Sequence, residues 1–300
     1  MNLQINIFEP ASPSDPKLIK EAIANFKDAF LSYGNLTFSF MSPVGEVNPE
    51  LSYLAMDDEK KAQLFTNLVS SCNEDTYIIL SRGGYGTMRW LGKVDFDAIS
   101  SQLDKLLFIG FSDATFLACQ LINYNKTFLH GPMLSTFLTT CQESRTALME
   151  FLATGRLSEL RGKTLSAGVV RGPIIGGNLT CLCHTIGTPF EPAWVDKILF
   201  IEDCGEDIYR VDRMLTHLLS ARVLDKVKAI AIGTFLLKKH EKEKGHVLLK
   251  LFRDRLKGLG IPIVHNLPAG HGRCNMPILL GSDYELDATA GVLRPLYNFI

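Results

Sequence analysis

Residues 105–117 read KLLFIGFSDATFL, an apolar run that ends at Phe111, then a serine, then a stretch with helical periodicity. An apolar strand followed directly by a helix is the repeating unit of a parallel sheet that helices cover. Ser112 stands between the two, where its side chain would face solvent and the helix N-terminus would add positive potential. In an alternative interpretation, Ser112 or Asp113 only caps the helix.

The same rhythm of strand and helix extends toward the N-terminus. Apolar runs at residues 3–10, 36–40 and 76–81 predict strands. The stretch ending at Phe30 and residues 57–72 have helical spacing. Because strands and helices alternate, the first half of the chain predicts a parallel sheet with helices on its faces.

The second half of the chain predicts a separate domain. Between about residues 135 and 170 the pattern loosens into pieces rich in Thr, Ser and Gly, which is typical of a connection between domains. Strands and helices then resume, with a helix expected over residues 241–258 and a hairpin over residues 284–296. The expected division is an N-terminal domain at 1–145, a connection at 146–168 and a C-terminal domain at 169–300.

Composition narrows the classes of partner. The 300 residues include 31 basic and 32 acidic residues, for a net charge of -1. This balance predicts neither nucleic-acid binding nor a polybasic membrane patch. The N-terminus lacks the features of a secretory signal, and no apolar run approaches the roughly 18 residues of a membrane span. We therefore expect a cytoplasmic protein that acts on a small molecule or short peptide.

The cysteines predict neither disulfides nor a metal site. Their number, seven, is odd, and they are scattered through apolar segments, which is typical of reduced thiols. Cys181, Cys183 and His184 lie close in sequence, but no second pair of ligands accompanies them, so buried helical thiols are the favoured interpretation. No metal or cofactor is expected.

A glycine-rich loop follows the strand predicted at residues 76–81. In SRGGYG, the glycines lie at the carboxyl end of a strand, where ligands bind in open α/β sheets. Gly84 is the candidate to donate a backbone N–H to a reacting oxygen, together with the N–H of Asp113. A plain turn or a phosphate loop is the alternative, although the loop lacks the Lys and Ser/Thr of a P-loop.

Two further segments offer partners for a serine nucleophile. Glu202 and Asp203 end an apolar strand and could orient an imidazole, or could instead pair with Arg210 and Arg213 in the helix that follows. His271 has a glycine on each side, which favours a mobile, solvent-facing general base over a core histidine.

The segment around Ser112 is not that of an ordinary α/β-hydrolase. The nucleophile elbow of that fold reads GxSxG, and Ala114 stands where the second glycine belongs.

Six motifs in order resemble the LD-carboxypeptidase family, whose relatives include the microcin C self-immunity proteins. They are RGGYG, GFSD, HGPM, GGNL, ED followed by YRVDRML, and GHG before NMPILLG, and the resemblance spans nearly the whole chain. It implies an α/β protein with an N-terminal Rossmann-like parallel-sheet domain and a smaller C-terminal α/β domain with a mixed sheet. It also implies a serine peptidase with a Ser-His-Glu triad that needs no cofactor, and a homodimer.

The resemblance assigns roles to matching residues. Ser112 would be the nucleophile, His271 the general base and then acid, and Glu202 the residue that orients His271. Gly84 and Asp113 would form the oxyanion hole. The expected substrate-binding residues are Arg82, Gly83 and Tyr85, and Arg89 and Arg273 are further cations near the motifs.

The implied reaction is removal of the C-terminal D-alanine from cytoplasmic murein tetrapeptides during peptidoglycan recycling. An alternative is an immunity-type peptidase or amidase that cleaves peptidyl-nucleotide conjugates, for which Trp194 could stack on the nucleotide, although a packed loop tryptophan is the favoured interpretation. A catalytically silent ligand-binding protein is the alternative from another class. Glu9 departs from the family pattern, which puts the contacts of the first turn in question.

Overall fold

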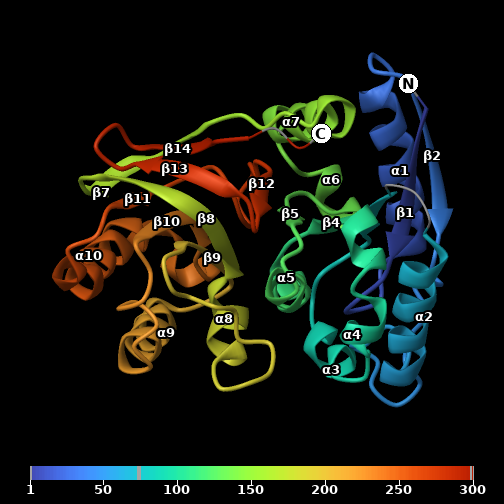
Figure 1. Cartoon of the computed structure of the whole chain (residues 1–300), viewed down its shortest axis with the longest axis horizontal. Helices are drawn as coiled ribbons and strands as arrows, with labels where there is room; N and C mark the ends of the chain where they lie inside the picture. Colours follow the sequence, from blue (N-terminus) through green and yellow to red (C-terminus); the bar gives the residue numbers. More distant parts are fainter. Residues whose placement is uncertain (1, 73–75, 298, 300) are drawn as a thin grey trace.

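The computed structural model describes residues 2–72, 76–297 and 299, which fold around two sheets (Figure 1). The first sheet has the strand order β12-β5-β4-β3-β1-β2. Its parallel strands are β1 (Asn2–Phe8), β2 (Asn35–Phe40), β3 (Thr76–Leu80), β4 (Leu106–Gly110) and β5 (Phe128–His130). The strands predicted in this half of the chain are therefore confirmed.

Helices cover both faces of the first sheet, as the continuous apolar strands require. They are α1 (Pro16–Phe30), α2 (Asp58–Ser71), α3 (Thr87–Leu91), α4 (Phe96–Ile99), α5 (Thr115–Asn123), α6 (Leu134–Phe137) and α7 (Gln142–Thr154). Helices α1, α6 and α7 pack on one face, and α2 to α5 pack on the other. Helix α1 begins where it does because Asp15 caps it and Pro16 occupies its first turn.

The second sheet has the order β6-β14-β13-β8-β9-β10-β11-β7. Its parallel strands are β8 (Val169–Asn178), β9 (Ile198–Cys204), β10 (Ala229–Leu236) and β11 (Ile263–His265). Its antiparallel strands are β6 (Leu160–Arg161), β7 (Lys163–Ser166), β13 (Asp283–Asp287) and β14 (Val292–Pro295). The predicted fold class, with a mixed second sheet and a C-terminal hairpin, is confirmed.

One face of the second sheet is covered by its own helices, and the other packs toward the first half of the chain. The helices are α8 (Leu179–Thr185), α9 (Ile208–Ser220) and α10 (Gly245–Leu256). On the opposite face, Phe200 of β9 shares one continuous core with Phe108 of β4. The two sheets are thus joined by buried apolar contacts.

A short strand crosses from the second half of the chain into the first sheet. Strand β12 (Ile278–Leu280) pairs antiparallel with β5 at the edge of that sheet. The strand pattern of the sequence did not predict this crossover, because three apolar residues carry no information about their partner. It fixes the segment after His271 to the sheet that carries Ser112.

The range predicted as a connection contains ordered elements. Helix α7 extends to Thr154 and packs on the first sheet, whereas β6 and β7 belong to the second sheet. The chain passes from one sheet to the other between α7 and β6. The predicted boundaries at residues 145 and 168 stay a prediction.

The expectation that all cysteines are reduced was wrong for one pair. Cys141, at the start of α7, forms a disulfide with Cys274, three residues after His271, and their Cα atoms lie 5.1 Å apart. The two are 133 residues apart in sequence, so spacing alone could not pair them. The remaining cysteines are free thiols, as predicted.

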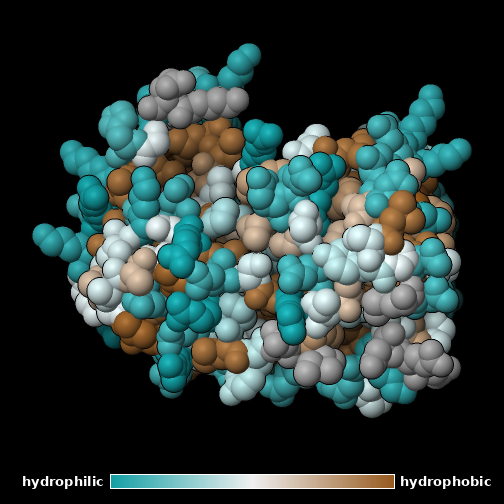
Figure 2. All heavy atoms as spheres, turned by 90° about the horizontal axis from the view of Figure 1, so that it is seen from above, coloured by the Kyte–Doolittle hydropathy of each residue, from teal (hydrophilic) through white to brown (hydrophobic). Residues whose placement is uncertain are grey.

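No helix among the described residues is long and apolar enough to cross a membrane. On the face shown in Figure 2, hydrophilic side chains are interspersed with hydrophobic ones.

Glu9 has a structural role in the turn after β1. Its carboxylate is fully buried and accepts hydrogen bonds from the backbone N–H groups of Ser14, at 2.7 Å, and Gly45, at 2.9 Å. It therefore holds two loops together, which answers the question raised by its departure from the family pattern.

We expect Glu9→Gln to destabilise the protein by about 1–3 kcal/mol, because one buried N–H loses its charged acceptor. Urea unfolding followed by circular dichroism measures this change. Glu21→Gln, an exposed position on α1, is the matched control and should shift stability by less than about 0.5 kcal/mol. Equal stabilities of the two variants would contradict this role for Glu9.

Candidate active site

Ser112 lies directly after β4, in a short 3-10 helix (Ser112–Ala114) that leads into α5. Its φ angle is 65°, in the left-handed region that residues other than glycine rarely adopt. Strained backbone of this kind clusters at functional sites, where it aims a side chain. A Cβ on Gly83 would lie 3.0 Å from the Cβ of Ser112, so the glycine-rich loop contacts the serine directly.

Ser12 holds the glycine-rich loop in place. Its Oγ accepts a hydrogen bond from Tyr85 N at 3.1 Å, and its own N–H donates to Gly83 O at 3.3 Å. Between them, Gly84 has a φ of 112°, and a side chain there would collide with Ser12. Only glycine fits this position, and among the described residues its N–H donates no hydrogen bond within the protein.

Asp113 connects the serine turn to the start of α3. Its buried carboxylate accepts a hydrogen bond from Thr87 N at 2.8 Å. Burial raises the pKa of this carboxyl, and the contact with Thr87 opposes that shift. The side chain therefore fixes the turn, which leaves the backbone N–H of Asp113 as its candidate contribution to an oxyanion hole.

Glu202 and His271 are brought together from two segments of the second half of the chain. Glu202 is fully buried near the end of β9, and its Oε2 lies 2.5 Å from Nδ1 of His271. The backbone N–H of His271 donates to the same oxygen at 3.1 Å. This arrangement fixes Nδ1 as the protonated nitrogen and leaves Nε2 for chemistry.

The interpretation of His271 as a mobile, solvent-facing residue was wrong. Its side chain is only 15% exposed. Gly270, with a φ of 116°, is required by close approach, because a Cβ there would lie 2.7 Å from the Cβ of Glu202. The loop is further held by Asn275, whose Oδ1 accepts a hydrogen bond from Gly270 N at 2.8 Å. The glycine serves packing, not mobility.

Asp203 does not contact the imidazole. Side chains alternate along a strand, so it lies on the face of β9 opposite to Glu202. It accepts hydrogen bonds from Asn178 Nδ2 and from the N–H and hydroxyl of Thr180, each at 2.9 Å, and from Cys204 N at 2.7 Å. Pairing of Glu202 or Asp203 with Arg210 or Arg213 is not observed among the described ion pairs.

The electrostatics of the site favour protonated His271 and neutral His130. Burial lowers the pKa of His271, but the charge of Glu202 and contacts with Cys204 and Glu202 outweigh it and raise the pKa to about 10. Burial, together with the nearby His271, lowers the pKa of His130 to about 3. The ring of Phe111 contacts both imidazoles, with its centroid 4.7 Å from that of His271 and 5.7 Å from that of His130.

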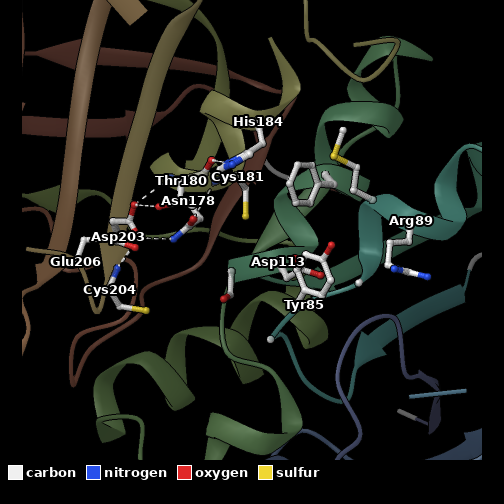
Figure 3. Close-up of a pocket in the computed structure, with 15 residues that line it drawn as sticks. Tyr85, Arg89, Asp113, Asn178, Thr180, Cys181, His184, Asp203, Cys204 and Glu206 are labelled. Carbon is white, nitrogen blue, oxygen red and sulfur yellow. Dashed lines mark hydrogen bonds between the residues drawn. The ribbon is translucent and has the colours of Figure 1, made fainter. Parts of the chain in front are cut away.

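A pocket of about 410 Å³ lies between the two halves of the chain (Figure 3). Its lining includes Ser112, Asp113, Gly84 and Tyr85, with apolar side chains on the same walls. This size is typical of a small-ligand site. Ser112 lines this pocket, whereas Glu202 and His271 are not among its lining residues. The ring of Phe111, the residue before Ser112, lies 4.7 Å from the imidazole of His271, which Glu202 contacts.

The predicted cations are placed differently. Arg82 is exposed and donates to Pro13 O at 2.8 Å, and it is not among the residues that line the pocket. Arg89 lines the pocket but pairs with Asp58 at 2.8 Å. The backbone carbonyl of Arg273 accepts a hydrogen bond from Cys141 N, and Arg273 does not line the pocket.

Sequence reasoning missed several lining residues. Asn178 caps α8 by accepting from Cys181 N, and its own backbone N–H donates to Thr115 Oγ1, a contact between the two halves. The GGN motif at the end of a strand was the available signal. Cys204 and Glu206 also line the pocket.

One group among the described residues has metal-ligand spacing, Cys141, Glu143 and Cys274, whose ligand atoms lie within 4.8 Å of one another. Two of these three atoms are joined in the disulfide, and none of the three residues lines the pocket.

Known proteins resemble this chain over most of its length. A Synechocystis sp. protein named as a putative carboxypeptidase is 37% identical over 80% of this chain and 79% of its own. A probable murein peptide carboxypeptidase of Bacillus subtilis is 30% identical over 93% of this chain and 86% of its own. The crystal structure of muramoyltetrapeptide carboxypeptidase from Oxalobacter formigenes is similar, with a TM-score of 0.81 and 27% identity over 99% of this chain and all of that one.

Two family domains account for most of the chain. Residues 5–131 match the LD-carboxypeptidase N-terminal domain, and residues 171–286 match the LD-carboxypeptidase C-terminal domain. Ser112 lies in the first match, and Glu202 and His271 lie in the second. The chain belongs to the LD-carboxypeptidase family.

Proposed function

We propose that this chain is a serine-type LD-carboxypeptidase that removes the C-terminal D-alanine from murein tetrapeptides in the cytoplasm, for peptidoglycan recycling. The observation that carries the proposal is the Glu202–His271 pair, whose imidazole contacts Phe111, the residue before the strained Ser112 that lines the pocket. The family and the murein peptide relatives support the choice of substrate class. A homodimer, which the family resemblance implies, is part of the proposal.

The first half of the reaction forms an acyl-enzyme. Ser112 Oγ attacks the carbonyl carbon of the diamino acid, which forms the peptide bond to D-alanine, and His271 Nε2 takes the hydroxyl proton. The negative charge that develops on the carbonyl oxygen is stabilised by the N–H groups of Gly84 and Asp113. His271 then gives its proton to the amine of D-alanine, which leaves.

The second half releases the shortened peptide. Water attacks the ester, His271 takes a proton from that water, and Ser112 Oγ leaves with the proton that His271 returns. Throughout, Glu202 accepts a hydrogen bond from Nδ1–H of His271. Its negative charge stabilises the imidazolium, which forms once in each half of the reaction. The carboxylate is suited to this role because it is buried and cannot turn to solvent.

The peptidyl-nucleotide alternative finds no stacking residue in Trp194. This side chain is 2% exposed, and its Nε1 donates to Glu191 Oε1 at 2.8 Å. The tryptophan is packed and hydrogen-bonded, so its face is not offered to a base.

The proposal predicts that the wild type, but not Ser112→Ala, releases D-alanine from the tetrapeptide L-Ala-γ-D-Glu-meso-diaminopimelate-D-Ala. Mass spectrometry measures this release. Ser112→Ala removes the acyl-enzyme route, and turnover should fall on the order of 10⁴ to 10⁶. Matching circular dichroism melts show that the variant is folded. Near-normal turnover by Ser112→Ala would overturn the nucleophile assignment.

The same assay separates the alternative functions. If the wild type releases no D-alanine, peptidyl-nucleotide conjugates are tested next. If the wild type cleaves neither substrate, a catalytically silent ligand-binding protein is favoured.

Replacing Glu202, whose carboxylate contacts His271, should lower kcat more than replacing Asp203, its neighbour on β9. Glu202→Gln removes the anion that fixes the tautomer, so we expect kcat to fall on the order of 10³ to 10⁴. Asp203→Asn leaves the imidazole contact intact and serves as the matched control. A larger loss in Asp203→Asn, with both variants folded, would show that the wrong carboxylate was chosen.

The pH profile should report the raised pKa of His271. Because only the neutral imidazole accepts the serine proton, kcat/KM should rise with pH through an apparent pKa above the usual value for histidine. Activity is thus lost as the pH falls through that pKa. Glu202→Gln removes the negative charge that raises the pKa of His271, whereas burial still lowers that pKa. The rise of kcat/KM should therefore occur at lower pH in this variant. If kcat/KM rose over the same pH range in both proteins, Glu202 would not be the group that raises the pKa of His271.

A further inference from the structure

Three carboxylates line the pocket among the described residues, and one of them has a buried oxygen without a hydrogen-bond partner. Asp113 is engaged by Thr87, and Asp203 by Asn178, Thr180 and Cys204. The third is Glu206, whose Oε2 is buried without a hydrogen-bond partner.

The nearest cation satisfies Glu206 poorly. Arg210 NH1 lies 3.6 Å from Oε2, beyond hydrogen-bond distance. Arg210 also lies 3.6 Å from Asp207, and its Nε donates to the hydroxyl of Tyr209. It is shared among several groups and half exposed, so it reduces the local negative charge without completing the coordination of Glu206.

The backbone fixes Glu206 on the wall that the second half of the chain contributes. Gly205 N donates to Leu236 O at 2.7 Å, and Lys238 N donates to Glu206 O at 3.3 Å. In Figure 3, Glu206 lies beside Asp203 and Cys204, across the pocket from Tyr85 and Arg89. The backbone of Glu206 therefore has a fixed place relative to β9 and to Glu202.

We propose that Glu206 binds the side-chain ammonium group of the diamino acid at the third position of the peptide. This inference rests on the proposed function, because it takes that diamino acid to be the residue that acylates Ser112. Its side chain then extends from the serine into the same pocket. The Glu206 side chain is 21% exposed, and one of its oxygens lacks a donor, which carries a desolvation cost. An ammonium group bound to this carboxylate supplies both a donor and the opposite charge.

The rest of the lining suits such a side chain. Met88 and Phe116 supply apolar surface for its methylene groups. Among the described residues that line the pocket, Arg89 is the one arginine or lysine, and it is already paired with Asp58. A substrate with an apolar stem and a terminal ammonium matches these walls, whereas a neutral side chain leaves Glu206 with only its 3.6 Å contact to Arg210.

The test measures kcat/KM for three tetrapeptides that differ only at the third residue: meso-diaminopimelate, L-lysine and L-norleucine. Norleucine has the lysine stem without its ammonium group. We expect the wild type to favour lysine over norleucine by about tenfold or more, as a hydrogen bond to a charged group implies. Diaminopimelate should be favoured over norleucine in the same way.

Glu206→Gln should bring the ratio of lysine to norleucine close to one, with the change mainly in KM. Glu21→Gln, exposed on α1, should keep the wild-type ratio. Equal cleavage of lysine and norleucine peptides by the wild type would overturn the inference even if the variant failed to fold. An equal loss on all peptides in a folded Glu206→Gln would also overturn it. No release from any peptide by the wild type would instead show that the proposed function has failed.

Discussion

The hydrogen bond between Glu202 and His271 is the contact on which the rest of the site depends. It joins the end of β9 to the segment between β11 and β12, and one carboxylate oxygen meets both the ring and the backbone of His271. Such an approach is possible only without a side chain at residue 270. The segment then continues through Cys274, bonded to Cys141, into β12 on the first sheet. The position of His271 is therefore set by both sheets together.

The serine side of the site depends on the turn after β1. Trp90 Nε1 donates to Pro10 O at 2.8 Å, and the fully buried Lys61 donates to Ala11 O at 3.0 Å. Ser12, next in sequence, holds the glycine-rich loop through Tyr85 N. Buried polar groups are tolerated because each finds a partner. A series of hydrogen bonds between side chains and backbone thus connects the turn after the first strand to the loop that carries the candidate oxyanion donor.

Short apolar runs in the sequence were sufficient to predict the parallel strands of the first sheet, because each of these strands coincides with such a run. Ser112 and Glu202 were found because each lies where such a run ends. The features that the sequence did not predict depend on contacts distant in the chain. The pairing of β12 with β5, the Cys141–Cys274 disulfide and the close packing at Gly270 are all of this kind. A glycine beside a histidine has the same sequence signature whether it gives mobility or permits close approach, and only the neighbour, Glu202, distinguishes the two.

Glu202, Asp203 and Glu206 lie close together at the end of β9, and backbone geometry alone gives them different partners. Alternation along the strand turns Glu202 toward His271 and Asp203 toward α8. The turn at Gly205 then carries Glu206 to the pocket wall without a hydrogen-bond donor for its Oε2. Neither composition nor spacing distinguishes these acids, because all three are acidic residues at the end of one apolar run. The difference lies in their partners, because Glu202 and Asp203 each accept hydrogen bonds from other residues, whereas the Glu206 side chain has only a 3.6 Å contact with Arg210. Glu206 is therefore the one of the three that we propose to bind a group of the substrate.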